Sequence, residues 1–347
     1  MPLASLTTIA ALATAAASGQ AIYELDRQAG TVTEAVIAVG VDDDPNAFDM
    51  TGSPAYSRDA GRIGFDVTYD EKWSLCRVAY WTRATDAVTV VGRGNYATFT
   101  PGDAEILSQT LYGDGSLVAF DVPPPHAKRS LGTRLRQPKL SPDGTLLMTQ
   151  AATDEPRTES LAIARADALG EGELTFAGEL LSRAEFARSP TATLPDGRPI
   201  LCTIVAVLEG GRDEETGEMH TGLFALDVVS ADADNPEDTS RLVGLGRLLL
   251  ARSEATGPLH YPAGAWRSDE VAFRFGDQKA GFAIGVLRQD QPGEYARIIQ
   301  APPSVYVAQV AMSPNAQFVA FKSNLFHRGP IRGRLYEASD LLPDAAE

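Results

Sequence analysis

The sequence predicts an all-β protein, a β-propeller of seven four-stranded blades, with six blades as the alternative. Two observations lead to this prediction. One turn motif recurs six times along the 347 residues, and strand pairs of a second type follow several of its copies. Repeated strands separated by turn signals, at intervals of roughly 40–50 residues, are typical of propellers. We therefore expect a single domain over residues 1–347, with blades beginning near residues 3, 53, 96, 137, 189, 262 and 306.

The turn motif combines Ser/Thr-Pro, or a related pair, with Asp/Asn-Gly, or a related pair, before an alternating apolar strand. Pro presets φ at the first inner turn position, Asp or Asn bonds back to its own backbone, and Gly accepts a positive φ. Each copy therefore predicts a hairpin. The copies are SPAYSRDAGRIGFDV from Ser53, ATFTPGDAEILSQT from Ala97, QPKLSPDGTLLMTQ from Gln137, SPTATLPDGRPILCTI from Ser189, AGAWRSDEVAFRF from Ala263 and AQVAMSPNAQFVAFKS from Ala308.

A further strand pair after a hairpin completes a four-stranded antiparallel unit. Such pairs are predicted by RVAYWTRATDAVTVV from Arg77, SLAIARADALGEGELTFAGEL from Ser160, TGLFALDVV from Thr221 and GFAIGVLRQDQPGEYARII from Gly281. The first apolar residues after the six turns are Ile63, Ile106, Leu146, Ile200, Val271 and Phe318. Their separations of 43, 40, 54, 71 and 47 residues indicate blades with two loop insertions.

The N-terminal stretch TTIAALATAAASGQAIYELD fits either a signal peptide or a blade. No Lys or Arg precedes Arg27, so the basic region of a signal peptide is missing, although small residues at 15–17 offer a cleavage pattern. Alignment with the C-terminal copy predicts strands at residues 9–12, 22–25 and 31–39, with Ser18 and Gly19 in a loop. The blade interpretation is favoured. It favours a cytoplasmic location, with a periplasmic or secreted protein as the alternative.

Composition limits the class of partner. The formal charge is −16 and the isoelectric point is near 4.7, and no block of basic residues is present, so nucleic acid is not an expected partner. No apolar run reaches the roughly 18 residues of a membrane span. Cys76 and Cys202 each lie in an apolar run, which predicts two buried thiols, with one long-range disulfide as the alternative.

Two turn copies carry a family resemblance. SPDG followed by LLMTQ, and SPNAQFVAFKS near the C-terminus, resemble the repeats of TolB-type, WD-repeat-like β-propellers. The resemblance extends over nearly the whole chain. It implies an architecture and no particular activity, because such blades occur in binding proteins, accessory domains of peptidases and some lyases.

Basic or titratable residues precede four of the predicted innermost strands, where loops of a propeller surround its channel. They are Arg93, Arg134, Arg136, Arg188, His260 and Tyr261. In an acidic protein such a ring predicts a channel mouth that attracts a carboxylate or a phosphate. The alternative is that each Arg pairs with an acidic residue of a neighbouring blade.

Metal sites are weaker alternatives. His126, His220, His260 and His327 lie in predicted loops, and His260 and His327, with a carboxylate, could hold a divalent metal such as Ca²⁺ or Mn²⁺. Propeller-type oligogalacturonate lyases hold a metal through channel histidines, but their full ligand set is not matched. Asp42, Asp44 and Asn46 have the spacing of a calcium loop, yet Ala47 and Ser53 replace its Gly and Glu.

The sequence therefore predicts a non-catalytic binding or scaffold propeller without a cofactor, whose partner is a protein or a small anionic ligand. Its predicted ligand-binding residues are Arg93, Arg136, Arg188, His260, Tyr261 and His327. The alternative is a propeller-type polysaccharide lyase, or another carbohydrate-active enzyme, with a divalent metal. No G-x-S-x-G nucleophile elbow, P-loop or dinucleotide fingerprint is present.

Overall fold

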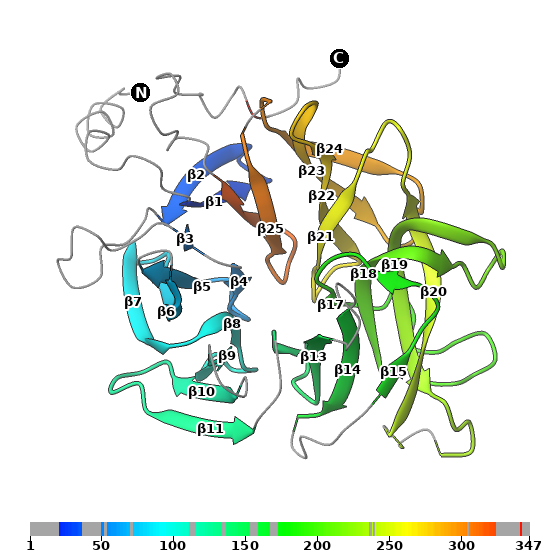
Figure 1. Cartoon of the computed structure of the whole chain (residues 1–347), viewed down its shortest axis with the longest axis horizontal. Helices are drawn as coiled ribbons and strands as arrows, with labels where there is room; N and C mark the ends of the chain where they lie inside the picture. Colours follow the sequence, from blue (N-terminus) through cyan, green and yellow to red (C-terminus); the bar gives the residue numbers. More distant parts are fainter. Residues whose placement is uncertain are drawn as a thin grey trace.

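The elements of the computed structural model are β-strands arranged around a central axis (Figure 1). The structure describes residues 21–36, 50–51, 54–69, 72–110, 116–132, 137–152, 159–166, 173–235, 238, 240–303, 305–323 and 341. Within these ranges, no helix is long and apolar enough to cross a membrane.

The strands form six blades, numbered here in chain order. Blade 1 contains β3 (Met50–Thr51), β4 (Ala55–Tyr56), β5 (Arg62–Tyr69), β6 (Lys72–Thr82) and β7 (Ala87–Arg93). Blade 2 contains β8 (Asn95–Phe99), β9 (Glu105–Gln109), β10 (Leu117–Asp121) and β11 (Lys128–Gly132). Blade 3 contains β12 (Lys139–Leu140), β13 (Leu146–Ala152), β14 (Glu159–Arg165) and β15 (Glu173–Thr175).

The remaining blades complete the ring. Blade 4 contains β16 (Glu179–Leu180), β17 (Glu185–Ala187), β18 (Cys202–Arg212), β19 (Met219–Ser230) and β20 (Arg241–Ala251). Blade 5 contains β21 (Leu259–Gly264), β22 (Glu270–Asp277), β23 (Gly281–Arg288) and β24 (Tyr295–Gln300). Blade 6 joins β25 (Val307–Met312) and β26 (Phe318–Ser323) to β1 (Ala21–Asp26) and β2 (Thr31–Val36).

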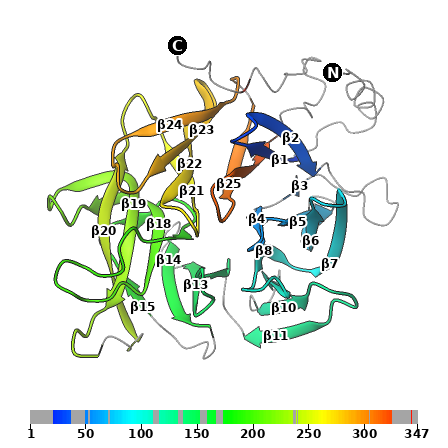
Figure 2. The same cartoon turned by 180° about the vertical axis from the view of Figure 1, so that it is seen from behind.

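The innermost strands form a closed ring. Each one contacts the next in the order β4, β8, β12, β17, β21 and β25, and β25 contacts β4. Figure 2 shows the same ring from behind, with the N-terminal strands of blade 6 beside the C-terminal ones. The propeller architecture predicted from the repeats is therefore confirmed.

Blade 6 joins the two ends of the chain and bears on the predicted number of blades. β1 pairs with β2 at one edge and with β26 at the other, so described strands occupy both of its edges. The first and last predicted blades are thus one sheet, and the count of seven is not confirmed: the described strands form six blades. Residues 1–20, with the predicted strand at residues 9–12 and the loop at Ser18 and Gly19, lie outside the described residues.

Six apolar clusters, one between each pair of neighbouring blades, form the core. Successive side chains of one strand point to opposite faces and so enter different clusters. In β6, Ala79 and Trp81 pack toward blade 6, whereas Val78 and Tyr80 pack toward blade 2. Because strands are buried on both faces, apolar residues follow one another where a half-buried strand would alternate.

The turn motif has one repeated hydrogen-bond network. In blade 3, Ser141 Oγ donates to Asp143 Oδ1 at 2.6 Å and accepts from the Leu146 amide at 2.9 Å. Ser57 and Asp59 make the same bonds in blade 1, and Ser313 and Asn315 make them in blade 6. The networks hold each innermost strand to its second strand, as the motif predicted.

The fourth copy of the motif does not join an innermost strand to its neighbour. The innermost strand of blade 4 is β17, which ends before Ser189, and the second strand begins at Cys202. The PDG turn instead closes a small loop in which the Leu194 amide bonds to the Arg198 carbonyl at 2.9 Å. Pro190, Pro195 and Pro199 lack amide donors, so this segment is a poor innermost strand.

Blades 3 and 4 share a nine-stranded sheet that the repeats did not predict. The outermost strands β15 and β20 pair in parallel, with Leu174 opposite Leu242. The two thiols are free, as expected, with Cys76 buried and Cys202 partly buried.

Candidate functional site at the channel mouth

The two ends of the ring of innermost strands differ. At the turn end, where turns join innermost to second strands, Arg58 of blade 1 donates to the Ser141 carbonyl of blade 3 at 2.7 Å. Its guanidinium carbon lies 3.6 Å from the centre of the Trp266 ring in blade 5. Arg58 therefore ties together three blades at this end. The opposite end, where the innermost strands begin, is called the mouth below.

At the mouth, the innermost strands of three blades bulge. Tyr96, Tyr261 and Gln309 have φ values of 60°, 50° and 52°, and the strand register shifts at each of these positions. Gln137, just before β12, has a φ of 47°. A left-handed conformation costs an L-residue about 1–2 kcal/mol. Strained backbone of this kind is common at functional sites. It turns a side chain in a direction that a regular strand would not allow.

In the three blades with bulges, the second strand carries a buried polar side chain next to the bulge of the innermost strand. Gln109, Arg274 and Lys322 pair with the residues that precede the bulges, Asn95, His260 and Ala308. Asp66 has the same position in blade 1, two residues after Gly64, which pairs with Ala55. All four side chains belong to residues that are at most 8% exposed.

Arg183 brings a further cation to the mouth. It precedes β17 in blade 4, and its guanidinium carbon lies 4.3 Å from the centre of the Tyr96 ring of blade 2. Arg274 lies 5.0 Å from the Tyr261 ring and 4.7 Å from the Phe282 ring, and it donates to the Val307 carbonyl at 3.2 Å. Aromatic faces, which attract cations, thus hold both guanidinium groups.

The charges at the mouth affect one another. Burial raises the pKa of Asp66 to about 6, although Arg183, Lys322 and the Tyr96 amide favour its charged form. Burial lowers the pKa of Lys322 to about 8, although Asp66 favours the ammonium. Burial also lowers the pKa of Arg274. Two cations, Arg183 and Lys322, therefore act on the buried carboxylate of Asp66, in a chain whose formal charge is −16.

Buried polar atoms without a hydrogen-bond partner gather at this end. Among the described residues there are five such side-chain atoms, and four of them, Asp66 Oδ1, Gln137 Oε1, Arg274 Nε and Gln309 Oε1, belong to residues at or beside the mouth. The fifth, Arg58 Nε, lies at the turn end. Buried polar atoms normally have partners, so this concentration indicates a place where water or a ligand is bound.

The structure places some of the predicted site residues at the mouth and others elsewhere. His260 and Tyr261 lie on β21 at the mouth, with ring centres 6.0 Å apart. Arg93 is exposed at the end of the outermost strand β7. Arg188 follows β17 instead of preceding an innermost strand, and its amide bonds to the Ala265 carbonyl at the turn end. Its predicted place at the mouth is therefore wrong. Arg134, Arg136 and His327 lie outside the described residues.

The sequence contained a signal for the residues that were missed. In five blades, the second strand carries a polar residue two positions after a residue that pairs with the innermost strand. These polar residues are Asp66, Gln109, Gln150, Arg274 and Lys322. The same register therefore carries a polar residue in five of the six turn copies. Aligning the second strands by their turns would have revealed it. Arg183 has no such signal, because its distance from the turn differs in blade 4.

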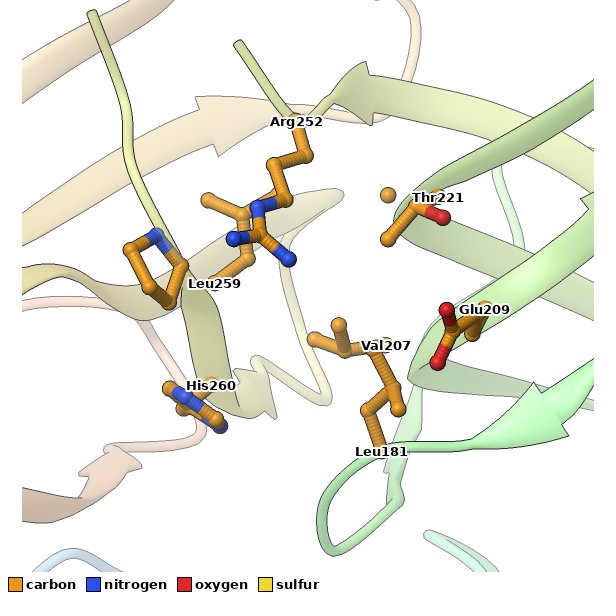
Figure 3. A pocket seen from close by; sticks show the side chains of 9 residues that line it. Leu181, Val207, Glu209, Thr221, Arg252, Leu259 and His260 are labelled. Carbon is orange, nitrogen blue, oxygen red and sulfur yellow. The ribbon is translucent and has the colours of Figure 1, made fainter. Parts of the chain in front are cut away.

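A pocket of about 210 Å³ lies beside the mouth, between blades 4 and 5. Leu181, Val207, Glu209, Arg252, Leu259 and His260 are among its lining residues (Figure 3). Burial lowers the pKa of His260 to about 4, and the charges of Arg274 and Arg252 act in the same direction. His260 is therefore neutral at pH 7.

The predicted metal sites have no support in the described residues. No group of three or more His, Cys, Asp or Glu side chains there could hold a metal ion. Asp42, Asp44 and Asn46, the possible calcium loop, lie outside the described residues, as does His327.

No protein-family model matches the chain, and no curated protein matches it either. Similar solved structures include TolB from Acinetobacter baumannii, with a TM-score of 0.44 and 13% identity over 88% of this chain and 63% of that one. The Cps50 (Swd1) β-propeller domain of Myceliophteria thermophila has a TM-score of 0.47 and 11% identity over 88% of this chain and 96% of that one.

An oligogalacturonate lyase in complex with manganese is also similar, with a TM-score of 0.46 and 11% identity over 87% of this chain and 78% of that one. The structures found thus include TolB-type and WD-repeat propellers, the two kinds that the repeats resemble. Because all three TM-scores are below 0.5, the propeller assignment rests on the closed ring of innermost strands and on no single similarity.

Proposed function

We propose that this protein is a non-catalytic binding propeller that holds an anionic group at the mouth of its channel. The observation that carries the proposal is that two cationic side chains at the mouth lack a polar partner in the described part of the chain. The side chains of Arg183 and Lys322 lie at the mouth and make no hydrogen bond or ion pair with another described residue. A carboxylate or phosphate between them would accept charge-assisted hydrogen bonds from both.

The charge balance supports an anion rather than a cation. Among the described residues, Asp66 is the one carboxylate whose charge acts on Lys322, and burial raises its pKa to about 6, which disfavours its charged form. A positive region in an otherwise acidic protein concentrates the field at the mouth and raises the rate at which anions reach it.

The aromatic residues at the mouth add contact area. Tyr96, Tyr261 and Tyr306 come from blades 2 and 5 and from the segment that leads into blade 6, and all three are partly exposed. Such rings supply broad apolar surfaces beside a charged group. The predicted residues His260 and Tyr261 are thus part of the proposed site, joined by Arg183, Arg274 and Lys322.

Binding measurements with simple anions test the proposal. Citrate, inorganic phosphate and a triglutamate peptide are titrated into the protein at low salt, to separate small ligands from acidic peptide segments. We expect Arg183→Gln and Lys322→Gln each to weaken binding of the preferred probe by roughly 10- to 100-fold, the effect of losing a charged hydrogen bond.

Arg129→Gln is the matched control, because this side chain is 59% exposed and pairs with Glu105 on the outer part of blade 2. It should leave the affinity nearly unchanged. Failure of the wild-type protein to bind any of the three probes at millimolar concentration would exclude the proposed site. An equal loss in the Arg129 variant would also contradict it, since the effect would then come from total charge.

A further inference from the structure

The pocket between blades 4 and 5 carries two opposite charges that do not pair. Arg252 follows β20, and Glu209 lies on β18. Among the described residues, neither side chain forms a hydrogen bond or an ion pair. In Figure 3 the guanidinium of Arg252 extends into the pocket above Val207, and the carboxylate of Glu209 faces it from the opposite wall.

A bulge in β18 sets the direction of Glu209. The pairing of β18 with β19 shifts between Leu208 and Gly211, which leaves Glu209 and Gly210 without partners on β19. Gly210 has a φ of 61°, a conformation that glycine adopts without strain. Bulges of this kind re-aim side chains beside binding sites.

The other walls are apolar. Leu181, Val207 and Leu259 line the pocket, and the Leu181 amide bonds to the Val207 carbonyl at 2.9 Å, which ties two of these walls together. His260 closes one side with a ring that is neutral at pH 7, so it can donate or accept a hydrogen bond without adding charge.

We propose that this pocket binds a free amino acid with an apolar side chain, whose carboxylate bonds to Arg252 and whose ammonium bonds to Glu209. The pocket lies beside the proposed anion site and shares His260 with it, but its two charges, Arg252 and Glu209, are not part of that site. A plain carboxylate would be repelled by Glu209, and a plain amine would be repelled by Arg252, so the two charges together select a zwitterion.

The volume fits a ligand of this size. Pockets for drug-sized molecules span about 300–1,000 Å³, whereas this one encloses about 210 Å³. An aliphatic side chain such as that of leucine would pack against the leucines and valine of the walls and so remove apolar surface from water.

Three probes of one shape test the charge selection. They are L-leucine, 4-methylpentanoate, which lacks the amine, and 3-methylbutylamine, which lacks the carboxylate. Calorimetry or ligand-detected NMR should show that leucine binds at least about 10-fold more tightly than either analogue, the factor expected for one additional charged hydrogen bond.

Two variants separate the roles of the charges. Glu209→Gln should weaken leucine binding by about 10-fold and leave 4-methylpentanoate unaffected or improved. Arg252→Gln should weaken leucine binding similarly and leave 3-methylbutylamine unaffected or improved. Arg198→Gln, on the exposed loop with Asp196, is the matched control and should change nothing.

Lys322→Gln distinguishes this site from the one at the mouth. It should leave leucine binding unchanged even where it abolishes binding of citrate or phosphate. If leucine binds no more tightly than both analogues, or none of the three probes binds at millimolar concentration, the amino-acid site is excluded. The same holds if the Glu209 and Arg252 variants keep the wild-type preference for leucine.

Discussion

Arg183 of blade 4 and Tyr96 of blade 2 meet at the mouth of the channel, with 4.3 Å between the guanidinium carbon and the centre of the ring. Blade 3 lies between these two blades in the ring, so a single contact spans it. Tyr96 is in a left-handed conformation with a φ of 60°. The strained backbone and the cation–π contact together place a cation at the end of the ring where the innermost strands begin.

Asp66→Asn should change how stability depends on pH. Because burial raises the pKa of Asp66 to about 6, the folded protein keeps a proton that the unfolded chain releases near pH 4. The free energy of unfolding of the wild type should therefore fall as the pH rises from about 4 to 6. The shift of about 2 units corresponds to about 3 kcal/mol.

Denaturant unfolding across this pH range measures the difference between the two proteins. The variant should gain on the wild type as the pH rises, and the exposed Asp234→Asn should not. Parallel stability curves for the wild type and Asp66→Asn would show that Asp66 titrates normally.

The His260 ring should titrate near pH 4. Burial and the charges of Arg274 and Arg252 disfavour its protonated form. The chemical shifts of its ring protons, assigned by comparison with His260→Gln, give the midpoint directly. Arg252→Gln should raise that midpoint, because one of the repelling charges is removed. A midpoint near 6.5 would mean that the ring lies in water.

Arg83→Gln should weaken the junction between blades 6 and 1. Glu24 of β1 is 5% exposed, accepts a hydrogen bond from the Tyr56 hydroxyl at 2.8 Å and pairs with Arg83 at 2.5 Å. Removing the cation leaves a buried carboxylate without its charge partner. We expect a loss of about 2–4 kcal/mol in unfolding free energy, because the Arg83 end is partly exposed.

Glu24→Gln in the same chain should recover part of this loss, since no charge then remains buried. Denaturant midpoints measure both variants, with Arg129→Gln as the surface control. A double variant as unstable as Arg83→Gln alone would mean that the charge of Glu24 is unimportant.

Gly144→Ala and Ala316→Gly should differ in effect at matching turn positions. Gly144 has a φ of 76°, and a Cβ there would lie 2.1 Å from Pro101 Cγ, so alanine should destabilise the fold by more than about 1 kcal/mol. Ala316 has a φ of 59° and a methyl group buried in the cluster between blades 5 and 6, so glycine there relieves strain but loses buried apolar surface, and the two effects should nearly cancel. Thermal unfolding measures both, and a loss in Ala316→Gly as large as that in Gly144→Ala would contradict the strain.

Part of the site could be predicted from the sequence. His260 and Tyr261 were placed at the mouth because they stand just before a hairpin whose turn is recognisable. Arg188 was misplaced because a PDG turn that closes a small loop looks the same as one that joins two strands. Arg274 and Lys322 were missed because a polar residue in an apolar strand normally points to solvent, whereas here both side chains are buried.

The local chemistry of the chain by itself determined the hairpins. Ser and Asp side chains bond to the backbone of the same turn, Gly accepts a positive φ, and apolar runs flank them, so the all-β class and the blade repeat follow from neighbours in sequence. Only the tertiary structure decided how the ring closes and what gathers at its mouth. β1 takes its second partner, β26, from the far end of the chain, and Arg183, Lys322 and Asp66 meet from three different blades. Such contacts depend on the curvature and number of the blades, which no short segment specifies.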